Sequence, residues 1–597
     1  MDKPQGTRRR KARRRVMVLL VLCCAVFALF LARLAWLQFA MADHYAQKMA
    51  EAGSASYTLP QHAARGAITD RSGTVLAQDE TVYDVYLRVP APPGTNLRET
   101  VNTIAALTGG KDVETQLAAF CSAVSAGELP VTQGLDSIGA AAYYRAGLVQ
   151  SGAVRLAARG VRRWPDGTIL PHTLGFTGPI TAEQWPAAKA QGLAMDAAIG
   201  QNGLEAAYDT LLRGRDGQLQ INVGLDGVTR ETVQTSTPVP GCTLVLTLDA
   251  DLQKTLQTAL QNQMDTLRTT KGIGAGREVR AGAAVVVDVR TGGILAAVSL
   301  PDFDLSRYRG DYAALSADST APLLDRVCQG LYAPGSAFKP AVAAAALTAG
   351  IDPAATVNCT GKYFYYSNYH PGCLQYGHRG PVDLRTALEY SCNIFFYDTG
   401  RRLGVDTFSA MARQLGLAND TGVEITAAQG RLTWSTDTNY QDGLTLMAAI
   451  GQGNTAVTPL QLAQYAAALA NYGRKPTLHF ADRAVQPATG AAVWQYEPAF
   501  TEIPGGEAVF GPIRDGMKRM AQTARVLREA PVTVAAKTGS PQLADTLPGG
   551  SHYVNSVLIG YAPADDPQIA MAVVLEYGGG GANAAPVMRA VLDAWFE

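Results

Sequence analysis

One uncharged run near the start of the chain limits what this sequence can become more than any other feature. It is VMVLLVLCCAVFALFLA, seventeen residues at positions 16–32. Because lipid offers the backbone no hydrogen-bond partners, such a run crosses a membrane as a helix. It spans roughly 25 Å at about 1.5 Å per residue, and the apolar residues after Arg33 complete a ~30 Å core. Arg33 can extend its charge to the interface, where Trp36 is also favoured. We therefore predict a transmembrane helix over 16–40.

The residues before this run predict its orientation. Eight of the first fifteen residues are Lys or Arg and one is acidic. A positive flank stays in the cytoplasm, so we expect a cytoplasmic tail over 1–15, a single pass through the cell membrane and an extracytoplasmic remainder. The alternative is a cleaved signal peptide with AMA before Asp43 as its processing site. That alternative requires an unusually long apolar region containing an arginine.

Composition bounds the rest of the chain. Its 597 residues are enough for two to four domains, and 47% of them are hydrophobic, enough for sizeable cores. Lys plus Arg and Asp plus Glu both number 51, so the formal net charge is zero. This balance argues against a nucleic-acid partner, which would select a basic surface.

The pattern of apolar and turn residues predicts strands at both ends of a helical middle. Residues 64–77 are expected to form a hairpin, and 88–96 a proline-rich break. Residues 97–240 mix helical and loop patterns. A strand over 243–248 should lead into a helix capped by Asp249, and 281–299 should form a second hairpin. Three β-rich runs and an apolar helix close the chain, which predicts an α+β domain over about 241–597, one mainly antiparallel sheet flanked by helices.

The segment YAPGSAFKP contains a serine and a lysine that could act as a nucleophile and its base. Ser336 stands three residues before Lys339, just after a Pro-Gly break. The alanine-rich stretch that follows predicts a helix ending at Gly350, with Pro340 tolerated in its first turn. Positions i and i+3 share a helix face, so Lys339 is expected beside the Ser336 hydroxyl. Burial would favour a neutral amine that can take the serine proton. Alone, such a pair is also compatible with a solvated helix face.

A second motif, Ser391-Cys392-Asn393, follows fifty-five residues after Ser336. The Ser391 hydroxyl can relay a proton between a base and a leaving amine. The Asn393 side chain can bond a substrate amide. Both roles suit acyl transfer at Ser336.

A third motif, Lys-Thr-Gly-Ser, ends a β-rich run a further 146 residues on. Lys537, Thr538 and Ser540 can hold a carboxylate, while Gly539 lets a substrate approach the strand closely. The backbone N–H groups of Ser336 and Ser540 would form an oxyanion hole. The ordered set Ser-x-x-Lys, Ser-x-Asn and Lys-Thr-Gly is typical of penicillin-binding proteins and serine β-lactamases.

The whole chain resembles a class B penicillin-binding protein, a membrane-anchored peptidoglycan D,D-transpeptidase. The resemblance extends through blocks in the family's order: RGAITDRSGTVLA, GQNGLEAAYDTLLRGRDG, LTLDADLQ, PGSAFKP, GQGNTAVTPLQLA, KTGS and IGYAPADDP. Ser540 departs from the commoner threonine but keeps the hydroxyl, and GVEITAAQGRL replaces an acidic-proline loop. The resemblance implies a penicillin-binding transpeptidase domain over 241–597 after an extended, β-rich pedestal or dimerisation-type module over 41–240.

By this resemblance the substrate is a stem peptide ending in D-Ala-D-Ala. Ser336 would attack the penultimate carbonyl, D-Ala would leave, and an amine of a neighbouring stem would resolve the acyl-enzyme. β-Lactams would acylate Ser336 and be released slowly. The alternative from a different class is a penicillin-binding scaffold or receptor that is acylated without turnover.

Four side chains around the Ser-x-Asn motif could bind a metal: Cys359, Cys373, His378 and Cys392. Three thiolates and an imidazole make a tetrahedral zinc set, and His370 is a spare ligand. The alternative is a Cys359–Cys373 disulfide, which an exported domain permits, with Cys392 simply packed. The resemblance adds that elongation-type members can carry zinc at matching positions. Such an ion would be structural, and no cofactor is expected for catalysis.

The resemblance also implies a partner, a polytopic membrane glycan polymerase reached through the anchor and pedestal. The cysteine loop leans towards an elongation (cell-shape) or sporulation role, without excluding cell division. β-Lactam affinity, the acceptor amine and the oligomeric state cannot be read from the sequence.

Overall fold

The computed structural model describes residues 6–44, 55–123, 127–195, 197–223, 229–272, 274–373, 378–548 and 550–597. The chain divides into two compact units. One combines Met1–Ala63 with Arg215–Val239, and the other combines Ala64–Gly214 with Pro240–Glu597.

The first unit contains the apolar helix expected from the sequence. Helix α1 covers Gly6–Ala35 and continues as a π-helical turn, η1, over Trp36–Ala40. Within it, Arg13–Ala40 is long and apolar enough to cross a membrane. The helix begins inside the basic tail, whose first five residues lie outside the described part of the chain. The unit also holds an antiparallel sheet of β1 (Ala55–Gln61), β8 (Gly217–Val223) and β9 (Thr229–Ser236).

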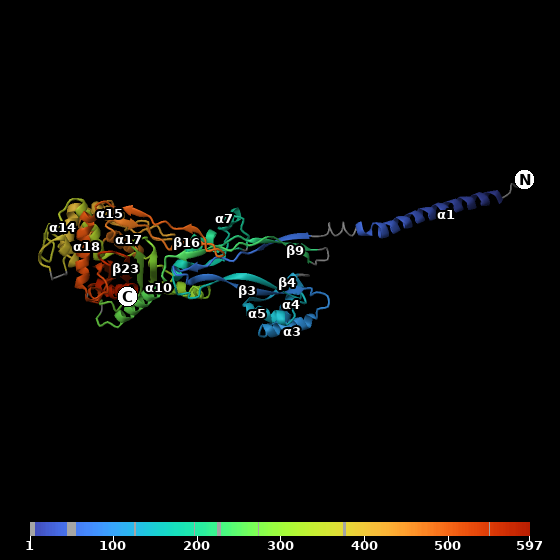
Figure 1. The fold of residues 1–597 in the computed structure, drawn as a ribbon, viewed down its shortest axis with the longest axis horizontal. Coiled ribbons are helices and arrows are strands. Elements are labelled where there is room, and N and C mark those ends of the chain that lie inside the picture. Colours follow the sequence, from blue (N-terminus) through green and yellow to red (C-terminus); the bar gives the residue numbers. More distant parts are fainter. Residues whose placement is uncertain are drawn as a thin grey trace. The chain divides into compact units, whose positions relative to one another are not determined.

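The second unit contains a seven-stranded sheet, of which β3, β4 and β16 are labelled in Figure 1. Its order is β17-β16-β10-β2-β3-β4, with β5 also paired to β3. The strands are β2 (Ile68–Thr69), β3 (Val75–Val89), β4 (Gly127–Leu135), β5 (Val154–Arg163), β10 (Thr243–Leu246), β16 (Ala481–Val485) and β17 (Ala492–Gln495). The expected hairpin is present as β2 and β3, which pair antiparallel.

The region 97–240 is richer in strands than its helical and loop patterns predicted. It contains β4, β5, β8 and β9 as well as the helices α3 (Leu97–Leu107), α4 (Val113–Ala123) and α5 (Ser137–Arg145). β5 reads VRLAARGVRR, which lacks an alternation of apolar and polar residues. It is a strand because β3 pairs with it along ten residues, a tertiary contact that overrides local propensity.

A buried ion-pair cluster connects this region to the segment around Arg65. The fully buried Glu205 carboxylate accepts hydrogen bonds from Arg65 Nε and Arg162 Nε, both at 2.6 Å. Arg65 also donates to Asp209 Oδ1 at 2.7 Å, and Arg162 to the Gly66 carbonyl at 2.9 Å. The two guanidiniums keep the buried carboxylate paired, which is the condition for burying it without a large desolvation cost.

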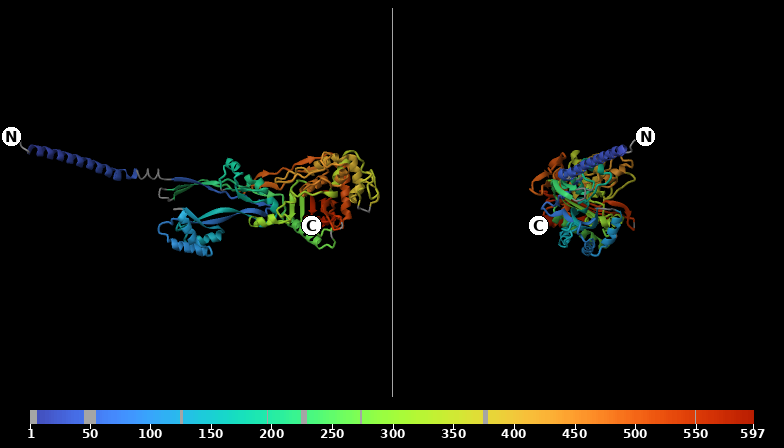
Figure 2. Two further views of the ribbon diagram at one scale, coloured as in Figure 1. Left: turned by 180° about the vertical axis from the view of Figure 1, so that it is seen from behind. Right: turned by 90° about the vertical axis from the view of Figure 1, so that its right-hand side faces the viewer.

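The second unit also contains a five-stranded antiparallel sheet with the order β12-β11-β23-β22-β19. The strands are β11 (Gly282–Asp288), β12 (Ile294–Leu300), β19 (Ala535–Gly539), β22 (Ser556–Ala562) and β23 (Ile569–Leu575). β11 and β12 form the expected hairpin, and β23 from near the chain's end pairs beside β11. Figure 2 shows these red C-terminal strands next to the green ones.

Successive residues of these strands face two different cores, because a strand turns its side chains to alternate faces. In β11, Val285 packs into a core shared with α17 (Pro459–Ala470). Its neighbour Val286 packs into a second core with α10 (Ala250–Arg268) and α20 (Ala585–Phe596). The sheet is therefore covered by helices on both faces, as the α+β expectation required (Figures 1 and 2).

Helix α10 begins where the sequence predicted. The Asp249 side chain accepts a hydrogen bond from Leu252 N–H at 3.0 Å and so caps the helix. The other helices around the sheet are α12 (Lys339–Thr348), α13 (Leu384–Glu389), α14 (Asn393–Leu403), α15 (Val405–Gln414), α16 (Asp442–Ala449) and α18 (Gly506–Thr523). The remaining described elements are α6 (Pro171–Leu174), β6 (Thr177–Pro179), α7 (Trp185–Ala190), β7 (Ala198–Gly200), α8 (Gly203–Ala207), α9 (Asp209–Leu212), α11 (Tyr308–Ala317), η2 (Gly335–Phe338), β13 (Val357–Cys359), β14 (Gly380–Val382), β15 (Arg474–Pro476), β18 (Phe500–Glu502), α19 (Arg525–Arg528), β20 (Gln542–Thr546), β21 (His552–Val554) and η3 (Gly581–Ala584).

Candidate active site

Ser336 and Lys339 lie at the junction of a 3₁₀ turn and a helix. Ser336 belongs to η2, and Lys339 is the first residue of α12, with Pro340 in its first turn as predicted. Gly335 has φ +56, and a Cβ there would lie 3.0 Å from the Pro541 ring. Only glycine fits this turn easily, and the turn leaves Ser336 partly exposed while Lys339 is fully buried.

The Lys339 ammonium contacts the Ser-x-Asn motif. Its Nζ donates to the Ser391 carbonyl at 2.7 Å and to Asn393 Oδ1 at 2.7 Å, and it lies 3.1 Å from Ser391 Oγ. Among the described residues, the Ser336 hydroxyl is not a hydrogen-bond partner of Lys339. The shared helix face therefore brings the two residues to one site, but the amine bonds to the oxygens of the neighbouring segment.

Lys537 reaches the same hydroxyl from the sheet. Its Nζ lies 3.0 Å from Ser391 Oγ and donates to the Thr538 carbonyl at 3.0 Å. Lys537 is on β19, which pairs antiparallel with β22. The Ser391 hydroxyl thus lies between two buried lysines that come from segments far apart in the sequence.

Both lysines have lowered pKa values. Burial lowers the pKa of Lys339 to about 7, although the nearby thiols of Cys392 and Cys373 oppose the shift. Burial, and secondly the Lys339 charge, holds the pKa of Lys537 well below its usual range. The Lys339 amine is therefore neutral in part near pH 7 and can accept a proton there, and the lowered pKa of Lys537 favours its neutral form.

Ser391 holds its position with an unusual backbone. Its φ is +57, in the left-handed region that a serine seldom adopts. The cost is of the order of 1–3 kcal/mol and persists only where neighbours impose it. Here Lys339 Nζ holds the Ser391 carbonyl, and Cys392 N–H donates to the Ala387 carbonyl at 2.9 Å. The strain orients the Ser391 side chain towards the lysines.

The residues of all three motifs surround one open cavity of about 430 Å³. Ser336, Ser391, Asn393, Thr538 and Ser540 line it. Lys339 and Lys537 lie behind this lining and bond to it through Ser391. The structure therefore brings together the residues that the sequence singled out as catalytic and substrate-binding candidates.

The end of β19 lies directly against the serine-bearing turn. A Cβ on Gly539 would come within 2.2 Å of the Pro334 carbonyl oxygen, so only glycine allows this approach. Gly581 N–H donates to Ser540 Oγ at 2.8 Å, which leaves the Ser540 hydroxyl proton free to donate into the cavity. Asn393 donates from Nδ2 to the Gly372 carbonyl at 3.2 Å while its Oδ1 accepts from Lys339.

Several lining residues were not singled out from the sequence. They are Tyr369, Pro371, Gly372, Tyr397, Met447, Ile450, Gln452, Gln542 and Val554. Tyr369 comes from the segment YFYYSNYH, whose density of aromatic residues shortly before the Ser-x-Asn motif was the available signal. Gln452 lies in the block GQGNTAVTPLQLA, which the resemblance had already marked, whereas the local sequence around the remaining lining residues does not set them apart.

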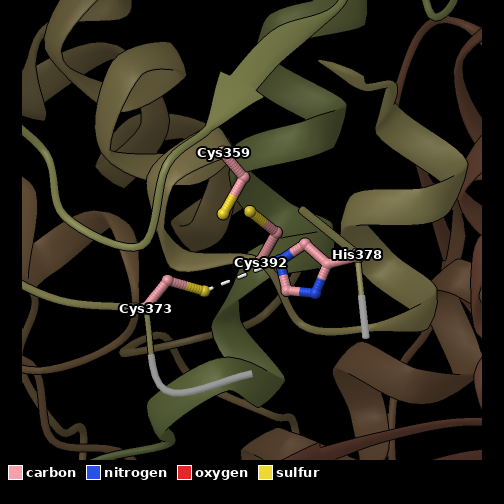
Figure 3. A group of neighbouring side chains, drawn as sticks. All are labelled: Cys359, Cys373, His378 and Cys392. Carbon is pink, nitrogen blue, oxygen red and sulfur yellow. Dashed lines mark hydrogen bonds between the residues drawn. The ribbon is translucent and has the colours of Figure 1, made fainter. Parts of the chain in front are cut away.

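The four predicted metal-binding side chains converge beside the Ser-x-Asn motif. Figure 3 shows Cys359, Cys373, His378 and Cys392 pointing towards one another. Their ligand atoms all lie within 4.8 Å of one another, and all four residues are buried. Cys373 Sγ and His378 Nε2 are 3.6 Å apart, and Arg379 Nη1 donates to Cys359 Sγ at 3.4 Å. His370, the spare ligand, is not in this group; its ring contacts Phe364.

This cluster has the chemistry of a structural zinc site. Its sulfur and nitrogen atoms are zinc's usual ligands, and four of them close a tetrahedron. All cysteines of the described chain are free, so no Cys359–Cys373 disulfide is present. The hydrogen bond with Cys373 and, secondly, burial raise the pKa of the Cys392 thiol, so buried thiolates would need a cation for compensation.

Comparisons with known proteins agree with this geometry. Residues 282–593 match the family model described as the penicillin-binding protein transpeptidase domain, and residues 60–246 match the penicillin-binding protein dimerisation domain. The peptidoglycan D,D-transpeptidase MrdA of Acinetobacter baumannii is 29% identical over 603 residues, which cover 96% of this chain and 86% of that protein.

Solved structures are similar over nearly the whole length. A Helicobacter pylori penicillin-binding protein, PBP2, solved with MreC, has a TM-score of 0.74 at 23% identity and covers 91% of this chain and 99% of its own. A chain of a peptidoglycan synthase complex, described as coordinating polymerization and crosslinking, has a TM-score of 0.73 at 29% identity and covers 98% of both chains.

The fold and the three converging motifs define a penicillin-binding transpeptidase domain, and with more than half of its length matched this chain belongs to that family. Because a dimerisation module precedes the transpeptidase domain, its place is among the class B penicillin-binding proteins.

Proposed function

We propose that this protein is a peptidoglycan D,D-transpeptidase that cross-links stem peptides through an acyl-enzyme on Ser336. The observation that carries the proposal is the Ser391 hydroxyl, held between two buried lysines beside a cavity that Ser336 lines. A hydroxyl between two amines of lowered pKa can move a proton in either direction. Acyl transfer needs such movement, first towards a leaving amine and then away from an attacking one.

The first half-reaction acylates the serine. Ser336 Oγ attacks the penultimate carbonyl of a stem ending in D-Ala-D-Ala, and its proton passes to the neutral Lys339 amine. The tetrahedral oxyanion is stabilised by the backbone N–H groups of Ser336 and Ser540. The C–N bond then breaks, and D-Ala leaves with a proton delivered through Ser391.

The second half-reaction reverses these roles. An amine of a neighbouring stem attacks the ester carbonyl and loses its proton through Ser391. The new amide forms and the proton returns to Ser336 Oγ. The terminal carboxylate of the donor is held by Lys537, Thr538 and Ser540 only during the first half-reaction, because it leaves with D-Ala. Asn393 bonds a peptide amide with its second Nδ2 hydrogen in both halves. All of these side chains lie around one cavity, which supports the proposal that they act on the same carbonyl group.

Turnover tests the proposal against the alternative of a penicillin-binding scaffold. The purified full-length protein is incubated with a D-Ala-D-Ala thioester mimic and an acceptor amine. We expect release of the new amide in wild type and none in Ser336→Ala. Capture of the acyl group without amide product would favour the scaffold, because the acceptor half-reaction would then be missing.

We further propose a structural zinc ion held by Cys359, Cys373, His378 and Cys392. When bound, zinc would neutralise the thiolates and fasten the segment that carries Ser391 and Asn393. The catalytic steps need no cofactor, since the nucleophile and bases are side chains of the chain itself. The support is the convergence of four buried ligand atoms.

Metal content and mass test this site directly. Native mass spectrometry of the purified protein should show one zinc per chain, and Cys359→Ser should lower that content, whereas the exposed Cys121→Ser should not. A two-dalton loss at Cys359 and Cys373 without metal would establish a disulfide instead and refute the zinc site.

We also propose the location and partner of the enzyme. A cytoplasmic tail (1–15) and a membrane helix (16–40) would anchor a pedestal module (41–240) and a catalytic domain (241–597) outside the cytoplasm. A polytopic glycan polymerase would bind the anchor and pedestal; the support is the similar chain of the peptidoglycan synthase complex. β-Lactams would acylate Ser336. Co-purification with a membrane polymerase, lost on deleting 1–240, would test the partner.

A further inference from the structure

A closed loop rich in aromatic residues borders the catalytic cavity. The backbone is bridged at the base of this loop, where Lys362 pairs with Gly372, Tyr363 N–H donates to the Pro371 carbonyl at 3.0 Å, and Cys373 N–H donates to the Gly361 carbonyl at 2.9 Å. We call residues 363–371 the aromatic loop. Its aromatic residues are Tyr363, Phe364, Tyr365, Tyr366 and Tyr369, beside the imidazole of His370.

The loop holds large apolar rings in solvent. Phe364 is 63% exposed, Tyr365 58% and Tyr369 38%. Single exposed apolar residues are ordinary, but a group of large rings on one short loop marks a binding surface. Tyrosine is well suited to such a surface, since it offers a broad, rigid contact with few rotatable bonds.

The Tyr365 ring is supported by contacts with Arg401 and Tyr363. The Arg401 guanidinium lies 3.9 Å from its centroid, and the Tyr363 ring stacks beside it at 6.2 Å with an interplanar angle of 15°. Tyr363 is itself buried and donates its hydroxyl to Asp398 at 3.0 Å, while Arg401 Nε donates to the Tyr363 hydroxyl at 3.0 Å. An exposed ring with such fixed support loses little conformational freedom when a ligand stacks on it.

The same loop continues into the catalytic cavity. Tyr369, Pro371 and Gly372 line that cavity, and the Tyr369 hydroxyl donates to Met447 Sδ at 3.2 Å. The Phe364 and His370 rings are 4.9 Å apart, which links the exposed end of the loop to the end near the cavity. A ligand whose reacting end lies in the cavity can therefore extend onto the loop.

We infer that the aromatic loop binds the saccharide strand to which the donor stem peptide is attached, with the pyranose faces stacked on Phe364 and Tyr365. This inference rests on the proposed function, because it concerns the rest of the same substrate. A stem of four residues between the reacting carbonyl and the sugar spans at most about 14 Å. The sugar must therefore lie near the cavity, and the loop is the aromatic surface that continues from it.

The chemistry of the loop suits an amino sugar. The C–H faces of a pyranose ring are apolar and pack on aromatic rings, while its hydroxyl and acetamido groups need hydrogen bonds. Ser367, Asn368 and His370 supply donors and acceptors between the rings. A binding site for a purely apolar partner would have no use for these groups at the centre of the loop.

The experiment compares one donor peptide with and without its sugar. Acylation of full-length protein is followed by intact mass, with the peptide either free or linked to an N-acetylglucosaminyl-N-acetylmuramyl disaccharide. We expect the disaccharide to raise the specificity constant by about fivefold for each ring that it covers. The ratio of the two constants should fall to near one in the double variant Phe364→Leu/Tyr365→Leu, which keeps apolar bulk but removes the planar rings.

Controls separate this inference from the proposed function. Tyr144→Leu, at a half-exposed tyrosine on α5, should leave the ratio unchanged. Binding of peptide-free glycan is also tested by saturation-transfer NMR, which needs no reaction. Ser336→Ala is compared with the triple variant that combines Ser336→Ala with Phe364→Leu and Tyr365→Leu. Transfer signals that are present in the first and lost in the second support the inference even if neither peptide acylates the enzyme.

Three results would overturn the inference. The first is equal specificity constants for the two peptides in the wild type. The second is a sugar-dependent increase in the specificity constant that persists in the double variant. The third is no NMR saturation transfer to free glycan. The first two leave the transpeptidase intact and make the loop a surface for a protein partner. Failure of both peptides to acylate the enzyme would refute the proposed function instead.

Discussion

Lys339 and Lys537 lie 3.1 Å and 3.0 Å from the same atom, Ser391 Oγ. Both ammonium groups are buried, and two positive charges cannot share one hydroxyl at low cost. At least one amine is therefore neutral near pH 7, which is the state a general base requires. The relationship makes Ser391 the proton exchange point of the site.

Ser336→Ala should abolish covalent labelling by a fluorescent penicillin. The substitution removes the only cavity-lining hydroxyl on the η2 turn and leaves the buried lysines and their partners in place. Labelling is read on a denaturing gel, and the thermal midpoint should stay close to that of wild type. Undiminished labelling would place the nucleophile elsewhere.

The rate of acylation should rise as pH increases through about 7 and then level off. Burial lowers the Lys339 pKa, so the amine is charged below that pH and cannot accept the Ser336 proton, and it is neutral above it. Stopped-flow acylation by a chromogenic cephalosporin across this range measures the profile. A rate that falls with rising pH would exclude a neutral lysine as the base.

Gly539→Ala should slow acylation by about a hundredfold, since a displacement of about 1 Å in an active site can have that effect. The new Cβ would come within 2.2 Å of the Pro334 carbonyl and push β19 away from the serine-bearing turn. Gly310→Ala is the matched control, because its Cβ meets nothing within 4 Å. Equal acylation by the two variants would show that this close approach is not needed.

Glu205→Gln should destabilise the protein by about 3–5 kcal/mol, because it leaves the buried Arg65 and Arg162 without their shared carboxylate. Glu80→Gln, in an exposed pair with Arg163, should change stability by at most about 1 kcal/mol. Urea midpoints of the two variants measure the difference. Similar midpoints would mean that the buried cluster adds no net stability.

Local patterns explain which elements were predictable. Asp249 caps α10 and the hairpin of β11 and β12 forms as expected, because capping and strand alternation act within a few residues. β5 was missed because its stability comes from pairing with β3, about seventy-five positions away at Asp84 and Arg159. Tyr369 was missed for a similar reason, since its place in the cavity depends on how its loop folds back.

The order and spacing of residues alone determined that this chain has an apolar span, a serine three residues before a lysine, and a cluster of thiols around a Ser-x-Asn motif. These properties depend on neighbours in the chain and survive without a fold. Only the tertiary structure decided that Lys339 bonds to Ser391 and Asn393, that four thiol and imidazole groups converge, and that an aromatic loop borders the cavity. These contacts join residues far apart in the chain, 52 positions for Lys339 and Ser391 and 146 for Lys537 and Ser391, and packing of the sheet and its helices brings them together.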